Sequence, residues 1–222
     1  MGVFSLRKPS NDEDPLPALY QDSWGDIFGR PAPSPILPLD EHRVMQAAVT
    51  DPAQFAQIYE LYFDRIYAYC LRRVYSAPNP HADAEDLASL IFTRALRSLD
   101  QFRNGSVRAW LFQIAHHAVV NYYRDRKHNV SLDVAMDQGS TQLHVADETL
   151  NTLIKEEAQE KLMHWIRELS DSQQNLIWMR ISGELTSEEI GQVVGKRAGA
   201  VRMELNRLIK QLRVRFEQEF GS

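Results

Sequence analysis

The sequence predicts an all-α protein of two small helical domains, joined by an acidic flexible linker and preceded by a proline-rich arm. Three observations favour this fold class. Apolar residues recur at helical spacing over 40–128 and again from Glu148, without the alternation typical of strands. Two capping boxes mark helix starts in the last third of the chain. Residues 131–160, which cover the connection and the start of the second helical region, hold seven acids and one lysine.

The N-terminal arm is predicted over residues 1–39, which hold seven of the ten prolines. Proline blocks helix interiors and central strands, so we expect an extended, mobile segment. Three large apolar side chains within it, Trp24, Ile27 and Phe28, exceed what a solvated tail needs. A loosely docked tail is one interpretation. A short docking motif, for the protein's own surface or for a partner, is the other.

The first domain, residues 40–128, is predicted to contain four helices with short connections. Asp51-Pro52 supplies an N-cap and a first-turn proline for the second helix. Asp83 stands where the N-cap of the third is expected, and Ser106 where that of the fourth is expected. The predicted elements are helices over 40–49 and from Asp51 to about Tyr75, a helix from Asp83, a loop over 102–105 and a basic-ended helix to His128.

The linker is predicted over residues 129–147, and the second domain over 148–222. A helix over 148–169 is followed by two capping boxes, Ser170 with Gln173 and Thr186 with Glu189. The second box opens a short helix with Gly195 at its expected C′ position. A turn and a longer basic helix follow. A short helix, a tight turn containing glycine and a longer basic helix are typical of a helix-turn-helix.

Charge and composition limit the classes of function that this protein can have. The net charge is −5, yet residues 103–127 carry five Lys/Arg and one acid, and residues 196–215 carry seven Lys/Arg and one acid. Such basic segments suit phosphate binding. The single cysteine, Cys70, fits a reducing cytoplasm and is expected to be buried. No membrane insertion, metal site, cofactor or catalytic residue is expected.

The motifs of the two domains together resemble the sigma-70 family of bacterial transcription initiation factors, in its extracytoplasmic-function (group 4) branch. The first domain carries the resemblance in DAEDL (83–87) with Phe92, SLDQF (98–102), AWLFQIA (109–115) and Asn121-Tyr122. The second carries it in LSDSQQNLIWMR (169–180), LTSEEIGQVVG (185–195) and GAVRMELNRLIKQLR (199–213). The resemblance covers roughly residues 51–216 and leaves out the arm.

The resemblance implies a cytoplasmic bacterial protein that binds the clamp coiled coil and flap of core RNA polymerase and recognises promoter DNA, both duplex and melted. An anti-sigma factor as regulator is also implied. The helix after DAEDL is expected to bind polymerase through Asp86, Ser89, Leu90, Thr93 and Arg94. Unpaired bases of the −10 element need stacking groups, polar side chains and cations, expected from Phe102, Arg103, Asn104, His117, Asn121, Tyr123, Arg124 and Lys127. The −35 element is expected to meet Arg197, Arg202, Met203, Glu204, Asn206, Arg207 and Lys210.

The chain departs from the family pattern at four places. Ser89-Leu90 replace the usual Gln-Glu pair, which either argues against the polymerase contact or makes that contact more apolar. His117 stands where asparagine is usual. Glu204 replaces a common basic residue, and its carboxylate can accept a hydrogen bond from a cytosine amino group. Lys196-Arg197-Ala198 replaces a more apolar turn.

Two other function classes compete with a promoter-specificity subunit. A stand-alone helix-turn-helix regulator would bind duplex DNA without polymerase, and would have no use for a loop built to hold unpaired bases. A phosphotransfer or hydrolytic enzyme is disfavoured, because the sequence shows no phosphate-binding glycine loop, nucleophile–base set or metal cluster.

Overall fold

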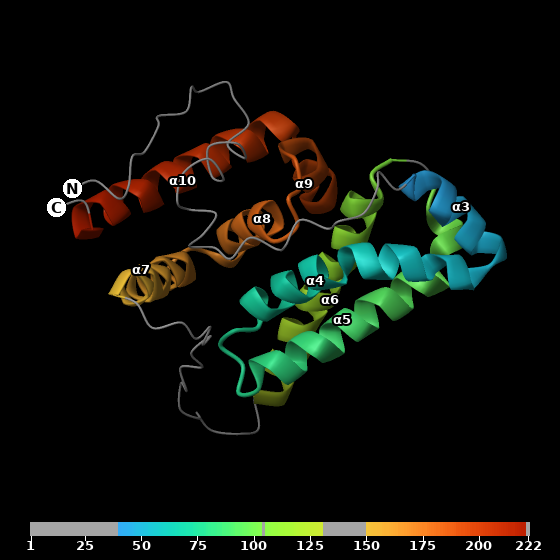
Figure 1. The fold of residues 1–222 in the computed structure, drawn as a ribbon, viewed down its shortest axis with the longest axis horizontal. Helices are drawn as coiled ribbons and strands as arrows, with labels where there is room; N and C mark the ends of the chain where they lie inside the picture. The colour runs from blue at the N-terminus through green and yellow to red at the C-terminus, as the bar shows by residue number, and fades with distance from the viewer. Residues whose placement is uncertain (1–39, 104, 131–149, 221–222) are drawn as a thin grey trace. The chain divides into compact units, whose positions relative to one another are not determined.

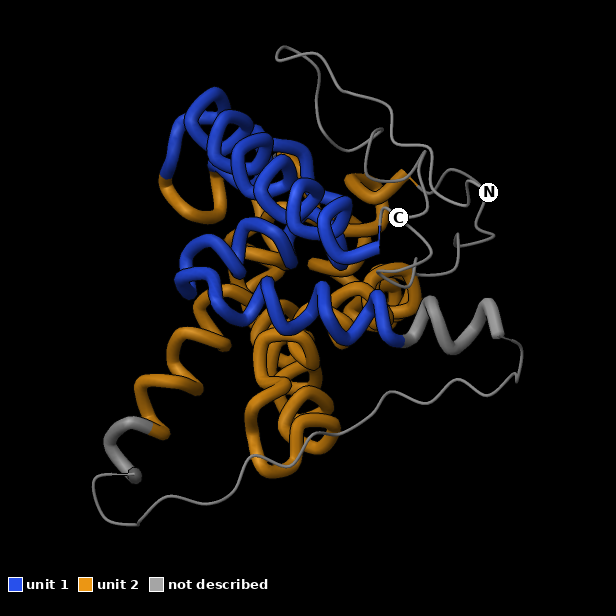
Figure 2. Tube along the Cα trace, turned by 90° about the vertical axis from the view of Figure 1, so that its left-hand side faces the viewer, with its two compact units in different colours: residues 1–30, 141–191, 196–222 blue, residues 31–140, 192–195 orange. Residues whose placement is uncertain are grey.

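The computed structural model describes residues 40–103, 105–130 and 150–220 (Figure 1), and all their regular elements are helices. Contacts within the chain define two compact units (Figure 2). Unit 2 contains residues 40–130 of the described chain together with Gln192–Gly195, and unit 1 contains residues 150–191 and 196–220. The predicted arm with Trp24, Ile27 and Phe28, the loop residue Asn104 and most of the linker lie outside the described residues.

Unit 2 begins with α3 (Glu41–Thr50), whose first turn is capped by Asp40 accepting from the Arg43 amide at 3.1 Å. The turn at Asp51-Pro52 opens a 3-10 helix, Pro52–Phe55, and α4 (Ala56–Arg73) continues from it. The predicted long helix is therefore two elements, and it ends at Arg73 rather than near Tyr75. Proline at the first position favours the start of a helix, because its φ angle is fixed and its missing N–H needs no partner.

Helix α5 (Pro80–Arg97) corrects one prediction. Asp83 is not the N-cap, because the helix begins at Pro80 with Asn79 as the capping residue. The carboxylate of Asp83 instead accepts from the Tyr122 hydroxyl at 2.6 Å and lies 3.3 Å from the Arg126 guanidinium. Asp83 thus connects α5 to α6 instead of ending α5. A short 3-10 helix, Leu99–Gln101, then leads into the loop.

Helix α6 (Val107–Val130) is capped by Ser106, whose hydroxyl accepts from the Ala109 amide at 3.1 Å, as predicted. It runs two residues past the predicted end, into the expected linker. Helices α4, α5 and α6 pack against one another (Figure 1). Their shared core is apolar and buried, and burial of each large side chain contributes about 1.5–3 kcal/mol. It includes Ile58, Ile66, Tyr69, Leu87, Ile91, Leu111, Phe112 and Ala115.

Unit 1 contains α7 (Leu150–Arg167), α8 (Asp171–Ile181) and α10 (Ala198–Phe220), with α10 packing on the other two. Short α9 (Ser187–Val194) precedes α10 in the chain. Both predicted capping boxes are confirmed. Ser170 and Gln173 each bond the other's amide, and so do Thr186 and Glu189. The apolar core of this unit contains Ala158, Leu162, Ile166, Leu176, Met179, Val201, Leu205, Leu208 and Leu212.

Cys70 on α4 is fully buried, as expected, and burial raises the pKa of its thiol. None of the helices described in the structure has the length and apolar character needed to cross a bilayer. Within the same residues, no three His, Cys, Asp or Glu side chains gather closely enough to hold a metal ion.

Candidate nucleic-acid and protein interfaces

One face of α5 presents all five residues expected to bind polymerase. Asp86, Ser89, Leu90, Thr93 and Arg94 recur at intervals of three and four, which places them on one side of a helix, and each is exposed. The opposite side of α5 is buried in the core of unit 2. Leu90 keeps 40% of its surface exposed, and it is the apolar residue among these five.

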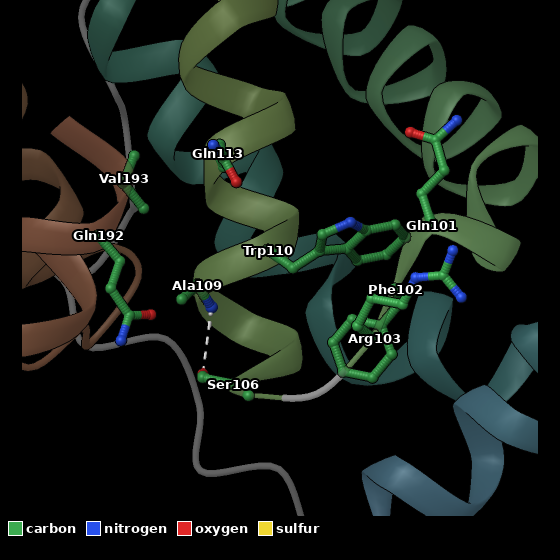
Figure 3. A pocket seen from close by; sticks show the side chains of 10 residues that line it. Gln101, Phe102, Arg103, Ser106, Ala109, Trp110, Gln113, Gln192 and Val193 are labelled. Atoms are coloured by element: carbon green, nitrogen blue, oxygen red, sulfur yellow. Dashed lines mark hydrogen bonds between the residues drawn. The ribbon is translucent and has the colours of Figure 1, made fainter. Parts of the chain in front are cut away.

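The loop before α6 is partly packed against its neighbours. The ring of Phe102 meets the edge of Trp110 with 5.5 Å between centroids (Figure 3), and lies 5.6 Å from the His42 ring on α3. Phe102 is therefore half-buried, whereas Arg103 is exposed. The packing leaves part of the Phe102 ring accessible to a stacking partner.

His117, Asn121 and Arg124 share one face of α6. Spacings of four and three place them together. His117 and Arg124 are exposed and Asn121 is half-buried. Arg124 lies 3.6 Å from Asp125, an exposed pair of little energetic weight. Exposed Val120 adds an apolar group to the same surface, which sequence reasoning did not single out.

Tyr123 does not join that face. Its hydroxyl donates to the backbone carbonyl of Arg73 at the end of α4, and its ring lies 5.8 Å from the Arg73 guanidinium. Near it, burial, followed by the charges of His117 and Arg73, lowers the pKa of His116. The structure thus brings three of the expected −10 residues together on α6 and places Tyr123 against α4. The side chain of Lys127 lies outside the described part.

The turn between α9 and α10 depends on two glycines. Gly195 has φ +68°, a left-handed conformation that costs glycine little, and it ends α9 as predicted. Gly191 has no room for a side chain, because a Cβ there would lie 2.6 Å from the Lys196 carbonyl oxygen. The Lys196 amide also donates to the Gly191 carbonyl at 2.9 Å. Together these contacts shape the turn before α10, which starts at Ala198.

Helix α10 exposes the residues expected to meet the −35 element. Its apolar stripe, including Val201, Leu205 and Leu208, is buried. Asn206 is half-buried, and the rest of the predicted set except Glu204 is exposed, namely Arg197, Arg202, Met203, Arg207 and Lys210. Glu204 differs from the expectation, because its carboxylate accepts from Lys196 Nζ at 2.9 Å. Sequence reasoning missed this pair, since the two residues are eight apart and only the turn brings them together.

A second residue that sequence reasoning missed is Arg180 on α8. Its side chain is fully buried, and its guanidinium donates to the Leu185 carbonyl at 2.6 Å and to the Ser187 hydroxyl at 2.8 Å. These bonds connect α8 to the first residue of α9. Arginine is seldom buried without such partners. A basic residue within an apolar helical stretch was the one available signal.

Comparisons with known proteins agree with this architecture. The family model Sigma-70 region 2 matches residues 58–129, which contain most of α4 and all of α5. RNA polymerase sigma factor YlaC of Bacillus subtilis is 32% identical over 158 residues, which is 70% of this chain and 88% of YlaC. ECF RNA polymerase sigma factor SigW of the same organism is 32% identical, over 77% of this chain and 95% of SigW.

A solved structure shares the fold. The structure of CnrH in complex with the cytosolic domain of CnrY aligns with a TM-score of 0.55 at 18% identity, over 81% of this chain and 97% of that one. Identity of about a third over most of two sigma factors, added to the match with region 2, decides the family. The chain belongs to the extracytoplasmic-function (ECF) RNA polymerase sigma factors of the sigma-70 family.

Proposed function

We propose that this chain is an alternative sigma factor that binds core RNA polymerase, recognises and melts a promoter, and starts transcription there. The observation that carries the proposal is the presence of an exposed α5 face and a helix-turn-helix in one chain, which is 32% identical to two sigma factors over most of their length. The chain is proposed to act in the bacterial cytoplasm. It supplies recognition, while polymerase makes the RNA.

The −35 and −10 elements of the promoter are proposed to bind different units of the chain. In unit 1, α10 inserts into the major groove of the −35 element. Arg197 and Lys210 contact phosphates there, and residues between them contact base edges. In unit 2, the loop at Phe102–Arg103 and the α6 face of His117, Asn121 and Arg124 hold unpaired bases of the −10 element. Stacking groups, polar hydrogen-bonding side chains and cations are what a melted strand requires.

The α5 face is proposed to bind the clamp coiled coil of polymerase, and unit 1 to bind the flap. Asp86, Ser89, Thr93 and Arg94 supply polar contacts around Leu90, and all are exposed. An interface with a central apolar group and a polar rim is the ordinary arrangement for stable association.

A protein regulator is proposed to hold this sigma factor inactive. One solved structure of similar fold is that of CnrH in complex with the cytosolic domain of CnrY. An anti-sigma factor would compete with polymerase for the α5 face. The arm is a second candidate for a regulatory contact, through Trp24, Ile27 and Phe28. Deleting residues 1–39 is expected to change affinity for polymerase or regulator, and unchanged values for both would refute a docking role.

In vitro transcription of the organism's genomic DNA tests the proposal. Core polymerase is supplied with this chain, with no sigma factor, or with a sigma factor of known activity, and transcript 5′ ends are sequenced. We expect new start sites that share −35 and −10 motifs only when this chain is present. If start sites appear with the known factor but not with this chain, the proposal fails. Duplex binding without start sites would favour a stand-alone regulator instead.

A further inference from the structure

Met203 is the most exposed large hydrophobic side chain in the part of the chain that the structure describes, at 74% of its surface. It lies in the second turn of α10, and the N-terminal residues of a recognition helix are those that reach base edges. Ala200, three residues earlier, and Arg207, four residues later, share its side of the helix and are exposed. An apolar tip therefore lies beside cations that suit phosphates.

The chemistry of methionine restricts which base it can recognise. A thioether has no hydrogen-bond donor and is a weak acceptor. It therefore cannot make the bidentate contacts by which arginine reads guanine or asparagine reads adenine. In the major groove the one apolar group on a base edge is the C5-methyl of thymine. A flexible apolar side chain at this place matches that methyl group.

The neighbouring residue that competes as a base reader is already paired. A free Glu204 carboxylate would accept from a cytosine amino group. Here its side chain is 21% exposed and accepts from Lys196 Nζ at 2.9 Å. The backbone of Lys196 is in turn held by the hydrogen bond that its amide donates to the Gly191 carbonyl. The ion pair neutralises the one acid among the exposed cations at the start of α10 and directs its carboxylate toward the turn.

We propose that Met203 is a specificity-determining residue that contacts the 5-methyl group of a thymine in the −35 element, while Lys196 withholds Glu204 from readout. This inference rests on the proposed function, because it requires α10 to enter the −35 major groove. It adds the identity of a base and the atom that is recognised.

Replacing thymine by deoxyuracil removes only that methyl group and tests the contact directly. A duplex that binds the complex of this chain with core polymerase is selected from random DNA. Each thymine in its −35 element is then replaced in turn, and affinity is measured by fluorescence anisotropy. Loss of one buried methyl is expected to weaken wild-type binding about fourfold at one position. In Met203→Ala the same replacement is expected to have no effect, and in Met203→Leu the sensitivity returns.

Val214→Ala provides the matched control, because Val214 is also an exposed apolar residue on α10 but lies near its other end. It is expected to retain the wild-type sensitivity to deoxyuracil. Equal sensitivity in wild type and Met203→Ala would overturn the inference, as would its absence at every position in wild type. Failure to select any duplex would instead count against the proposed function itself.

The role of Lys196 is tested by a separate pair of variants. Lys196→Ala releases the Glu204 carboxylate, which then repels phosphate, so affinity is expected to fall about threefold or more on all duplexes. Adding Glu204→Gln to that variant is expected to restore most of the loss. If the double variant binds as weakly as Lys196→Ala, Lys196 acts on DNA directly and the part of the inference that concerns Glu204 is wrong.

Discussion

The hydroxyl of Tyr122 on α6 donates a 2.6 Å hydrogen bond to the carboxylate of Asp83 on α5, across 39 residues of sequence. Burial, with the hydrogen bond to Asp83 next in weight, raises the pKa of Tyr122 to about 12. Arg126 completes the cluster from one turn further along α6 and donates to the same hydroxyl. The cluster holds α5, which presents the proposed polymerase face, against α6, which presents the proposed −10 face.

Tyr122→Phe is expected to loosen that connection without breaking either helix. A hydrogen bond that is partly exposed contributes about 0.5–1 kcal/mol, so the loss of stability is expected in that range. Amide hydrogen exchange is expected to accelerate in the first turns of α5 and the last turns of α6. The control is Tyr59→Phe, at an exposed tyrosine of α4. Equal exchange in both variants would mean that the cluster has no structural role.

Replacing Arg180 is expected to reduce the stability of unit 1 more than Tyr122→Phe reduces that of unit 2. Arg180→Met keeps most of the volume but removes the donors to the Leu185 carbonyl and the Ser187 hydroxyl. Groups that lose a buried partner cost about 1–3 kcal/mol each, so we expect unit 1 to lose about 2–4 kcal/mol.

Binding to −35 duplex is expected to weaken in Arg180→Met, because Ser187 begins the helix before the turn. Binding to core polymerase through α5 is expected to persist. The matched control is Arg215→Met, at an exposed arginine of α10 that pairs with Glu168 at 2.6 Å, and it should melt nearly as wild type does. A melting temperature of Arg180→Met as high as that of this control would show that apolar packing replaces the network.

These residues also show what the sequence can predict. Helix starts were recognisable where the signal is local, as at Ser106, Ser170 and Thr186, whose side chains bond amides within the next turn. The left-handed glycine at 195 was recognisable for the same reason. The residues of the α5 face came from the family resemblance, and their spacing of three and four places them on one side of the helix.

Pairings across the chain could not be predicted in this way. Asp83 resembles an N-cap until Pro80 is seen to start the helix a turn earlier, which leaves the carboxylate free to meet Tyr122. Tyr123 resembles a stacking group, yet its hydroxyl donates a hydrogen bond to the backbone carbonyl of Arg73 at the end of α4. The Lys196–Glu204 pair exists because Lys196 lies in the turn directly before α10, from where its side chain meets Glu204 in the second turn of that helix. Each depends on tertiary structure that no local pattern encodes.

The lowered pKa of His116 is expected to make the stability of unit 2 depend on pH. Burial, followed by the charges of His117 and Arg73, lowers its pKa below the ordinary value near 6.5. Between the folded and the unfolded pKa, the unfolded chain binds the proton more readily. The contribution of His116 to stability is therefore complete above about pH 6.5 and declines as the pH falls through that window. His116→Gln is expected to reduce the drop in melting temperature between about pH 7.5 and 5. His42→Gln, at an exposed histidine of α3, serves as control and should keep the wild-type drop.

Cys70 offers a probe of how unit 2 opens. Its thiol is fully buried away from solvent and reagent, and burial raises its pKa, so little thiolate forms at neutral pH. We expect no labelling by a thiol reagent on the timescale of minutes in the folded protein, and labelling of the single cysteine in denaturant. Labelling in the folded protein at the rate of a free thiol would contradict the burial of α4 against α5 and α6.

Leu90 tests the proposed polymerase contact where this chain departs from its relatives. The resemblance places a Gln-Glu pair at positions 89 and 90, so a carboxylate at position 90 suits the family's usual contact. Here Leu90 is 40% exposed within a polar face, and an apolar patch on the partner is its natural complement. Leu90→Glu would bury a charge against that patch and is expected to weaken binding to core polymerase about tenfold or more. Val49→Glu places the same charge at an exposed apolar residue on α3 and should bind core polymerase as wild type does. Unweakened binding by Leu90→Glu would mean that polymerase presents its usual polar surface and that Leu90 lies outside the contact.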